Sequence, residues 1–268
     1  MTSRLATALL ALGFGLAATL PAAAQPLPKP RTGGSEGAPE LEEGSATRGL
    51  LPPDVELIDM PTAAALDVGG FASRSRFFNQ GGALQWLGFG VYPRVNLGAS
   101  LHVDRLLGTD SPVQLTRPEL QVKWRFFDGD RLIPAFALGF DGQGYFYNRP
   151  VKRYNHKQRG LYFVATQEVG LPGLQAHAGM NISDFDTDDV FGSMGLSLNL
   201  YDRVKLLWEW DNIQDFFDSR LNAGLRFPIN PNFHADFAVR SIGQGGTFSN
   251  GVPRAPERII QFKYVGHF

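Results

Sequence analysis

Hydrophobic and polar residues alternate with a period of two over most of the chain beyond residue 65. The last segment is the clearest, because Ile260, Phe262, Tyr264 and Phe268 fall on one side of an extended chain while polar residues such as Lys263 fall on the other. Successive side chains of a β-strand point to opposite faces of the sheet. The pattern therefore predicts strands with one apolar and one mostly polar face.

Twelve segments of about ten residues carry this pattern, a length that suits a tilted membrane-crossing strand. They are residues 66–77, 83–92, 95–105, 119–127, 132–142, 160–169, 174–182, 190–200, 204–212, 219–227, 233–241 and 258–268. The connections after the even-numbered segments are tight turns, and the others are mostly longer. The strands of a soluble antiparallel sheet alternate similarly. In such a sheet, however, nothing requires short and long connections to follow one another in turn along the chain. The sequence predicts an all-β fold, a transmembrane antiparallel up-and-down β-barrel of about twelve strands.

The polar face of the segments predicts a charged barrel interior. On 204–212, Trp208 and Trp210 alternate with Glu209 and Asp211. The charged residues expected to line the lumen are Asp104, Lys123, Arg125, Asp141, Lys205, Glu209, Asp211, Arg226, Asp236, Arg240 and Lys263. Such mixed charge can pair and close the interior or line a narrow watery path. We expect Glu209 and Asp211 to pair with an inward arginine such as Arg226.

The two ends of the chain indicate export to the outer membrane. Residues 1–24 have the charged, apolar and small-residue regions of a signal peptide. Residues 25–54 are rich in Pro, Gly, Ser and Glu and predict a flexible periplasmic leader before a barrel domain over 55–268. The closing residues resemble the C-terminal signal that the barrel assembly machinery recognises; they are Ile260, Phe262, Tyr264 and Phe268.

Composition excludes several other classes of protein. The chain has no cysteine, so neither disulfides nor a lipid-modified cysteine can anchor it. Its formal net charge of -1 argues against nucleic acid as a partner, because nucleic-acid binding requires a basic surface. We expect no cofactor.

Candidate catalytic residues are few. His177 lacks a nearby serine in sequence, and two pairs share a strand face, His102 with Asp104 and His234 with Asp236. A hydrolase requires a nucleophile, a base and a group that orients the base. Polar filling of the lumen explains these pairs better than catalysis, so the sequence predicts a protein without catalytic residues.

Two expected loops carry concentrated charge. Asp184, Asp186, Asp188 and Asp189 offer oxygen ligands, but their spacing does not match a calcium-binding EF-hand loop, and we expect no metal site. The other loop is basic and contains Arg149, Lys152, Arg153, His156, Lys157 and Arg159. These basic side chains could contact lipopolysaccharide phosphates or an acidic glycan, or they could serve only to keep the loop soluble.

Several strings resemble the YjbH-like outer-membrane proteins, which are associated with exopolysaccharide production. They are residues 59–63 (DMPTA), 134–145 (PAFALGFDGQGY), 160–165 (GLYFVA) and the closing segment. The resemblance implies a non-enzymatic barrel in surface-polysaccharide production or export, with outer-membrane lipid, lipopolysaccharide and polysaccharide-export components as partners. A passive channel for small solutes or lipids and a lipid-acting enzyme are the alternatives.

Overall fold

The computed structural model describes residues 54–108, 112–148, 153–156, 160–183, 190–213, 219–243, 245–247 and 255–268. The expected signal peptide and the expected leader up to residue 53 lie outside the described residues. In the described part of the chain, no helix is long and apolar enough to cross a membrane.

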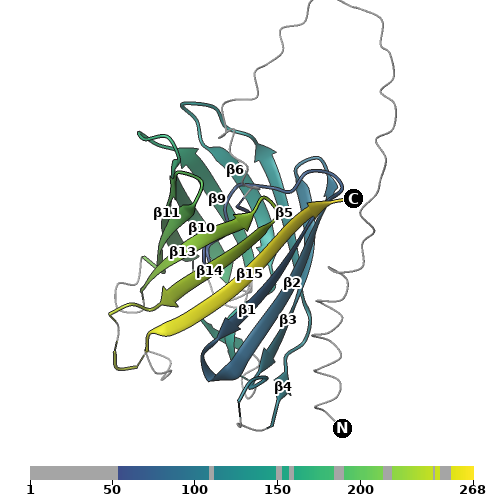
Figure 1. The fold of residues 1–268 in the computed structure, drawn as a ribbon, viewed down its shortest axis with the longest axis vertical. Coiled ribbons are helices and arrows are strands. Elements are labelled where there is room, and N and C mark those ends of the chain that lie inside the picture. The colour runs from purple at the N-terminus through teal and green to yellow at the C-terminus, as the bar shows by residue number, and fades with distance from the viewer. Residues whose placement is uncertain are drawn as a thin grey trace, which may run out of the picture. The chain divides into compact units, whose positions relative to one another are not determined.

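Twelve antiparallel strands close into a barrel in which the first strand lies beside the last (Figure 1). β1 (Gly70–Phe78) pairs with β15 (Glu257–His267) through a register that sets Arg74 opposite Lys263. The other strands follow in chain order: β2 (Gly82–Tyr92), β3 (Val95–Asp104), β5 (Glu119–Phe127), β6 (Ala135–Asp141), β9 (Gly160–Glu168), β10 (Leu174–Ser183), β11 (Val190–Leu200), β12 (Val204–Asp211), β13 (Arg220–Asn230) and β14 (Phe233–Arg240). This arrangement confirms the predicted up-and-down barrel.

Short additional elements lie in the connections at one end of the barrel, which we call the long-loop end. They are the 3-10 helix η1 (Asn79–Gly81), β4 (Gln114–Leu115), β7 (Tyr145–Asn148) and β8 (Arg153–His156). β4 pairs only with the edge of β3, and β7 pairs with β8 in a separate hairpin. The opposite end, where the tight turns and Phe268 lie, is the short-turn end. The sequence pattern did not predict these additional elements.

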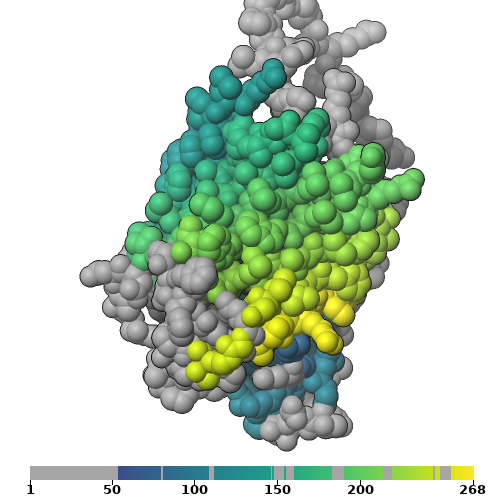
Figure 2. Space-filling model, turned by 90° about the vertical axis from the view of Figure 1, so that its left-hand side faces the viewer, coloured from purple at the N-terminus to yellow at the C-terminus, as the bar shows by residue number. Residues whose placement is uncertain are grey.

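The wall has an apolar outside and a polar inside, as lipid and lumen require. On β15, Ile260 is exposed while Gln261 and Lys263 are buried. Figure 2 shows part of this outer wall, where the strands coloured from green to yellow form a continuous surface. Exposed apolar side chains around the barrel include Leu87, Leu97, Leu120, Trp124, Leu138, Leu161, Met180, Leu196, Leu206, Trp208, Leu225 and Phe237.

The first strand begins later than its alternation predicts, at Gly70 instead of residue 66. The chain turns over residues 67–70, where the Gly70 N–H donates to the Asp67 carbonyl at 2.8 Å. Gly69 adopts a φ of 79°, in the left-handed region that favours glycine. This turn directs the preceding residues, 54–66, into the lumen instead of along the wall.

Residues 54–66 form a hairpin inside the barrel, which we call the inner hairpin. Its two arms are joined by hydrogen bonds from the Leu57 N–H to the Met60 carbonyl at 2.9 Å and from the Thr62 N–H to the Val55 carbonyl at 3.2 Å. The Leu66 N–H donates to the Asn96 side chain at 3.1 Å, near the start of β3. Both ends of the described hairpin, Leu66 beside Asn96 and Asp54 beside Lys205, therefore lie near the short-turn end.

The hydrophobic core is built between the inner hairpin and the wall. Leu57 and Ile58 pack in a buried cluster with Leu207. A second cluster contains Met60, Ala63, Ala137, Tyr162 and Val164, and a third contains Val55, Leu66, Ala72 and Val265. Because each cluster needs the hairpin, the hairpin supplies apolar contacts that the charged wall lacks.

Candidate functional site: the charged lumen and the inner hairpin

The tip of the inner hairpin is bound by Glu209 of β12. Its carboxylate accepts backbone N–H groups from Ile58 at 2.6 Å and from Asp59 and Met60 at 2.9 Å each. Asn222 of β13 donates to the same carboxylate at 3.1 Å. Successive backbone N–H groups that converge on one point form a favourable site for an anion. Glu209, which is completely buried, therefore finds in the hairpin the donors that a buried carboxylate requires.

Asp59 joins the hairpin tip to two arginines of the wall. Arg76 Nη1 donates to Asp59 Oδ1 at 2.7 Å, and Arg240 Nη1 donates to Oδ2 at 3.0 Å. Arg240 also forms an ion pair with Glu257 on β15. All of these groups are buried, so each charge depends on its partners because water cannot replace them.

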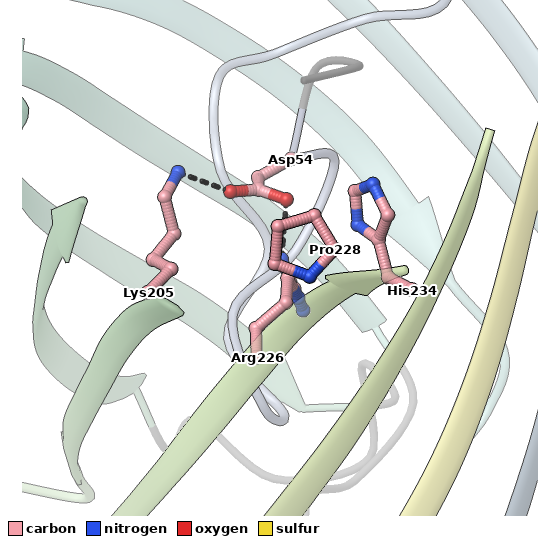
Figure 3. Close-up of a pocket in the computed structure, with 5 residues that line it drawn as sticks. All are labelled: Asp54, Lys205, Arg226, Pro228 and His234. Atoms are coloured by element: carbon pink, nitrogen blue, oxygen red, sulfur yellow. Dashed lines mark hydrogen bonds and ion pairs between the residues drawn. The ribbon is translucent and has the colours of Figure 1, made fainter. Parts of the chain in front are cut away.

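Asp54 joins the base of the hairpin to the wall near the short-turn end. Its carboxylate forms ion pairs with Lys205 of β12 and Arg226 of β13, which Figure 3 shows on either side of it. Burial alone would raise the pKa of Asp54, but the charges of Arg226, Lys205 and Lys263 outweigh burial and lower that pKa well below its ordinary value. Asp54 is therefore ionised at neutral pH.

Two further cations of the wall bind the hairpin, one through backbone carbonyls and the other through a carboxylate. Lys123 of β5 donates to the carbonyls of Val55, Thr62 and Ala64 at 2.6, 3.0 and 3.1 Å. Arg74 of β1 forms an ion pair with Glu56. The hairpin thus contacts charged side chains from strands all around the wall.

The β7–β8 hairpin closes the lumen from the long-loop end. The Tyr145 hydroxyl accepts a hydrogen bond from Arg76 Nη1 at 2.8 Å, and the Arg240 guanidinium lies 4.3 Å from the centre of the Tyr145 ring. The Tyr154 hydroxyl donates to Glu119 at 3.2 Å. Both tyrosines are buried, so this end of the lumen is also filled by the chain.

The structure places most of the expected lumen charges inside the barrel, but with partners that alternation could not predict. The buried ones are Lys123, Glu209, Asp211, Arg226, Asp236, Arg240 and Lys263. Lys205 and Asp141 are half-buried. Asp104 and Arg125 lie nearer the two rims, where they pair with His102 at 3.0 Å and Asp128 at 2.9 Å.

The expected pairing of Glu209 with an inward arginine is wrong, whereas Asp211 does pair with an arginine of the adjacent strand, Arg220 at 3.5 Å instead of Arg226. The register sets Arg226 opposite Lys205, and Asn222 opposite Glu209. Arg226 instead binds both oxygens of Asp236, from Nε at 2.9 Å and Nη2 at 2.8 Å. The prediction for Glu209 failed because the strand pattern does not include the inner hairpin, which supplies backbone donors to Glu209 and shares Arg226 with the wall residue Asp236.

Only some residues of the two charged loops predicted from the sequence lie in the described part of the chain. In the basic loop, the backbone of Arg153 and His156 lies in β8, while Arg149, Lys152, Lys157 and Arg159 lie outside the described residues, as does the acidic segment 184–189. The closing aromatic Phe268 lies at the rim, with its ring 4.9 Å from that of Phe71. Around the described residues, no group of three or more acidic or histidine side chains is arranged to bind a metal ion.

His177 and Ser197 form the arrangement most similar to a catalytic pair. His177 Nε2 lies 3.3 Å from Ser197 Oγ, and Nδ1 lies 3.0 Å from Thr166 Oγ1. Ser197 is completely buried, and Thr166 also accepts the Ala63 N–H of the inner hairpin at 3.0 Å. A substrate could not reach this serine while the hairpin is in place, and a hydroxyl instead of a carboxylate orients the histidine.

No family model and no curated protein matches the chain. Among solved structures, the KdgM porin is 8% identical with a TM-score of 0.48, and the alignment covers 74% of this chain and 99% of that porin. The outer membrane protein Omp33 of Acinetobacter baumannii is 6% identical with a TM-score of 0.43, covering 76% of this chain and 100% of that protein. The strand pairing of this chain defines a closed twelve-stranded barrel. Its exposed apolar wall is that of a transmembrane barrel, and the contacts of residues 54–66 fill its lumen.

Proposed function

We propose that the protein is a non-enzymatic outer-membrane channel for small polar solutes, which its own inner hairpin keeps closed. Side chains alone just fill an eight-stranded barrel, whereas barrels of sixteen to eighteen strands contain an aqueous channel. A twelve-stranded barrel lies between these sizes. In this protein the inner hairpin fills the space in the lumen that the side chains of the wall leave open. The observation that carries the proposal is the binding of this segment through Glu209, Asp59 and Asp54 to a charged wall.

The geometry of the inner hairpin suits a movable closure. Both ends of the described hairpin, Asp54 and Leu66, lie near the short-turn end, so its tip can withdraw toward that end without passing through the long-loop end. Water that enters the lumen as the hairpin withdraws would hydrate its charged groups, while the apolar contacts of Leu57 and Met60 would be lost. Withdrawal would leave a lumen whose wall carries charge of both signs, as in a narrow polar pore.

Neutralising the carboxylates of the hairpin tests this proposal. We expect the Asp54→Asn/Glu56→Gln/Asp59→Asn variant to conduct persistently in planar bilayers, while the parent stays mostly closed. Asp130→Asn is the matched control, because Asp130 lies in a short turn where its carboxylate accepts only the nearby N–H groups of Leu132 and Ile133. Equal conductance of the triple variant and the parent would refute the closure.

A role in surface-polysaccharide production or export is the second candidate. Two of the strings that resemble YjbH-like proteins, 59–63 and 134–145, meet in the lumen, where Asp59 and Tyr145 both contact Arg76. This convergence supports a shared lumen arrangement instead of a chance likeness of strand sequences. Deletion of the gene should then lower secreted polysaccharide, and the parent sequence but not an Arg76→Leu variant should restore it. Unchanged polysaccharide after deletion would remove this role.

A further inference from the structure

Two pairs of cations lie on the lumen wall near the base of the inner hairpin, one on β12 and β13 and the other on β15 and β1, with β14 between them. The strand register sets Lys205 directly opposite Arg226 and sets Arg74 directly opposite Lys263. His234 lies opposite Lys263 on the next strand. Like charges at directly opposed positions repel one another, and the wall itself supplies one anion to this cluster, Asp236 of β14, which binds Arg226.

The inner hairpin supplies carboxylates to this cluster but does not satisfy it. Asp54 bridges Lys205 and Arg226, and Glu56 pairs with Arg74. Lys263 is only 1% exposed, yet its Nζ has no hydrogen-bond partner among the described residues. Both ring nitrogens of His234 and Nε of Arg74 are likewise buried without a hydrogen-bond partner in the described part of the chain. Buried donors of this kind are normally satisfied.

A small cavity of about 10 Å³ lies beside Asp54, between Lys205, Arg226 and His234 of this group. Its lining residues are Asp54, Lys205, Arg226, Pro228 and His234, which Figure 3 shows around the Asp54 carboxylate. A cavity of this size holds about one water molecule. The Asp54 carboxylate therefore occupies most of the space that the surrounding cations offer to an anion.

We propose that Lys205, Arg226, Lys263, Arg74 and His234 form a binding site for the carboxylate of a small solute, and that Asp54 occupies this site in the closed state. An incoming carboxylate would replace Asp54 on Lys205 and Arg226 and would also reach the Lys263 amine. Because solute and hairpin compete for the same cations, a carboxylate-bearing solute favours withdrawal of the hairpin. This inference rests on the proposed channel function and adds the class of solute.

A matched pair of solutes tests the site directly. Gluconate and sorbitol are six-carbon polyols of similar size, but only gluconate carries a carboxylate. In the Asp54→Asn variant, gluconate should raise Tm in detergent in a concentration-dependent way, and sorbitol at equal ionic strength should not. Adding Lys263→Gln should reduce the gluconate shift. Equal Tm values with gluconate and sorbitol in Asp54→Asn would overturn the proposal.

A second measurement keeps Asp54 in place, in case its replacement prevents folding. A Met60→Cys variant places one thiol at the hairpin tip in a chain that has no other cysteine. Gluconate should raise the rate of labelling by a water-soluble thiol reagent by roughly fivefold or more, the lower range of a typical coupling between two ligands. An unchanged rate with gluconate would overturn the competition.

The two proposals fail differently. Absence of conductance from the triple carboxylate variant, together with a gluconate-dependent rise in Tm, would remove the channel role and support the anion site. Persistent conductance of that variant without any gluconate effect would support the channel and overturn the anion site.

Discussion

Asp59 and Tyr145 bind the same nitrogen of one arginine, Nη1 of Arg76, at 2.7 and 2.8 Å. Asp59 belongs to the hairpin that enters from the short-turn end, and Tyr145 belongs to the β7–β8 hairpin at the long-loop end. The two closures of the lumen are therefore joined through Arg76, and Arg240 also contacts both Asp59 and the Tyr145 ring. Displacing either closure leaves a buried guanidinium short of a partner, so the two should open together.

Replacing Arg76 tests this linkage. Arg76→Leu leaves Asp59 short of a partner in a buried site, and removing one member of a buried ion pair costs about 3–5 kcal/mol. We expect a clearly lower Tm in detergent and higher conductance. The control is Asp128→Asn, since Asp128 pairs with Arg94 at a site where both side chains are more than one-third exposed, and such pairs contribute about 0–1 kcal/mol. Equal losses in the two variants would contradict the role of Arg76.

The stability that Asp54 contributes to the folded state should decrease as the pH becomes acidic. Its pKa in the folded protein is lowered from the ordinary 3.8, because three cations outweigh the effect of burial. A lowered pKa stabilises the folded state above 3.8, and this stabilisation is lost as the pH falls below that value. The Tm difference between the parent and Asp54→Asn should therefore stay constant from about pH 7 to about pH 5 and shrink in more acidic buffer. A difference that already shrinks above pH 5 would contradict the ion pairs.

A change of shape without a change of charge should also displace the hairpin. A Cβ atom on Gly195 would lie 2.5 Å from Leu57 Cδ1 and 3.3 Å from Met60 Sδ. Gly195→Val should raise conductance and lower stability by about 1–3 kcal/mol through overpacking. Gly245→Val is the control, because nothing lies within 4 Å of a Cβ atom built there. If Gly195→Val conducted like the parent, the close contact of the hairpin with Gly195 would not be required for closure.

The terminal aromatic should matter for assembly. Phe268 stacks on Phe89 with ring centres 6.4 Å apart, and its N–H donates to the Gly69 carbonyl at 3.0 Å. Deleting it removes both this packing and the expected assembly signal, so we expect lower outer-membrane levels with export to the periplasm unchanged. Phe268→Tyr should retain normal levels. Fractionation and heat-modifiability on gels measure both, and normal barrel after the deletion would refute the expectation.

The twelve wall strands could be predicted because lipid and lumen impose alternation on each of them. The prediction of strand positions failed in segments that do not separate lipid from the lumen. Leu66 and Val68 alternate with Asp67 and Gly69, so the strand was expected to begin at residue 66, whereas it begins at Gly70. β7 and β8 are short and pair only with each other, so they carry too few residues for a periodic signal.

The inner hairpin could have been detected from composition but not from periodicity. Residues 55–66 contain Val55, Ile58 and Met60, residue types that are absent from residues 25–54, and this contrast marks a segment that is buried. Its partners could not be predicted, because backbone groups of the hairpin satisfy Glu209 and Lys123. Alternation identifies which charges face inward, but it contains no information about a segment that crosses the lumen.

Fixing the inner hairpin in place tests the central claim most directly. The Ala63 N–H lies 3.0 Å from Thr166 Oγ1, so the Ala63→Cys/Thr166→Cys variant can be joined by a short bifunctional thiosulfonate in a chain without other cysteines. Conductance of the same protein is then measured in planar bilayers before and after reduction of the link. The structure predicts no conductance while the link is present and channel openings after reduction. Equal conductance in the linked and reduced states would contradict closure by the inner hairpin.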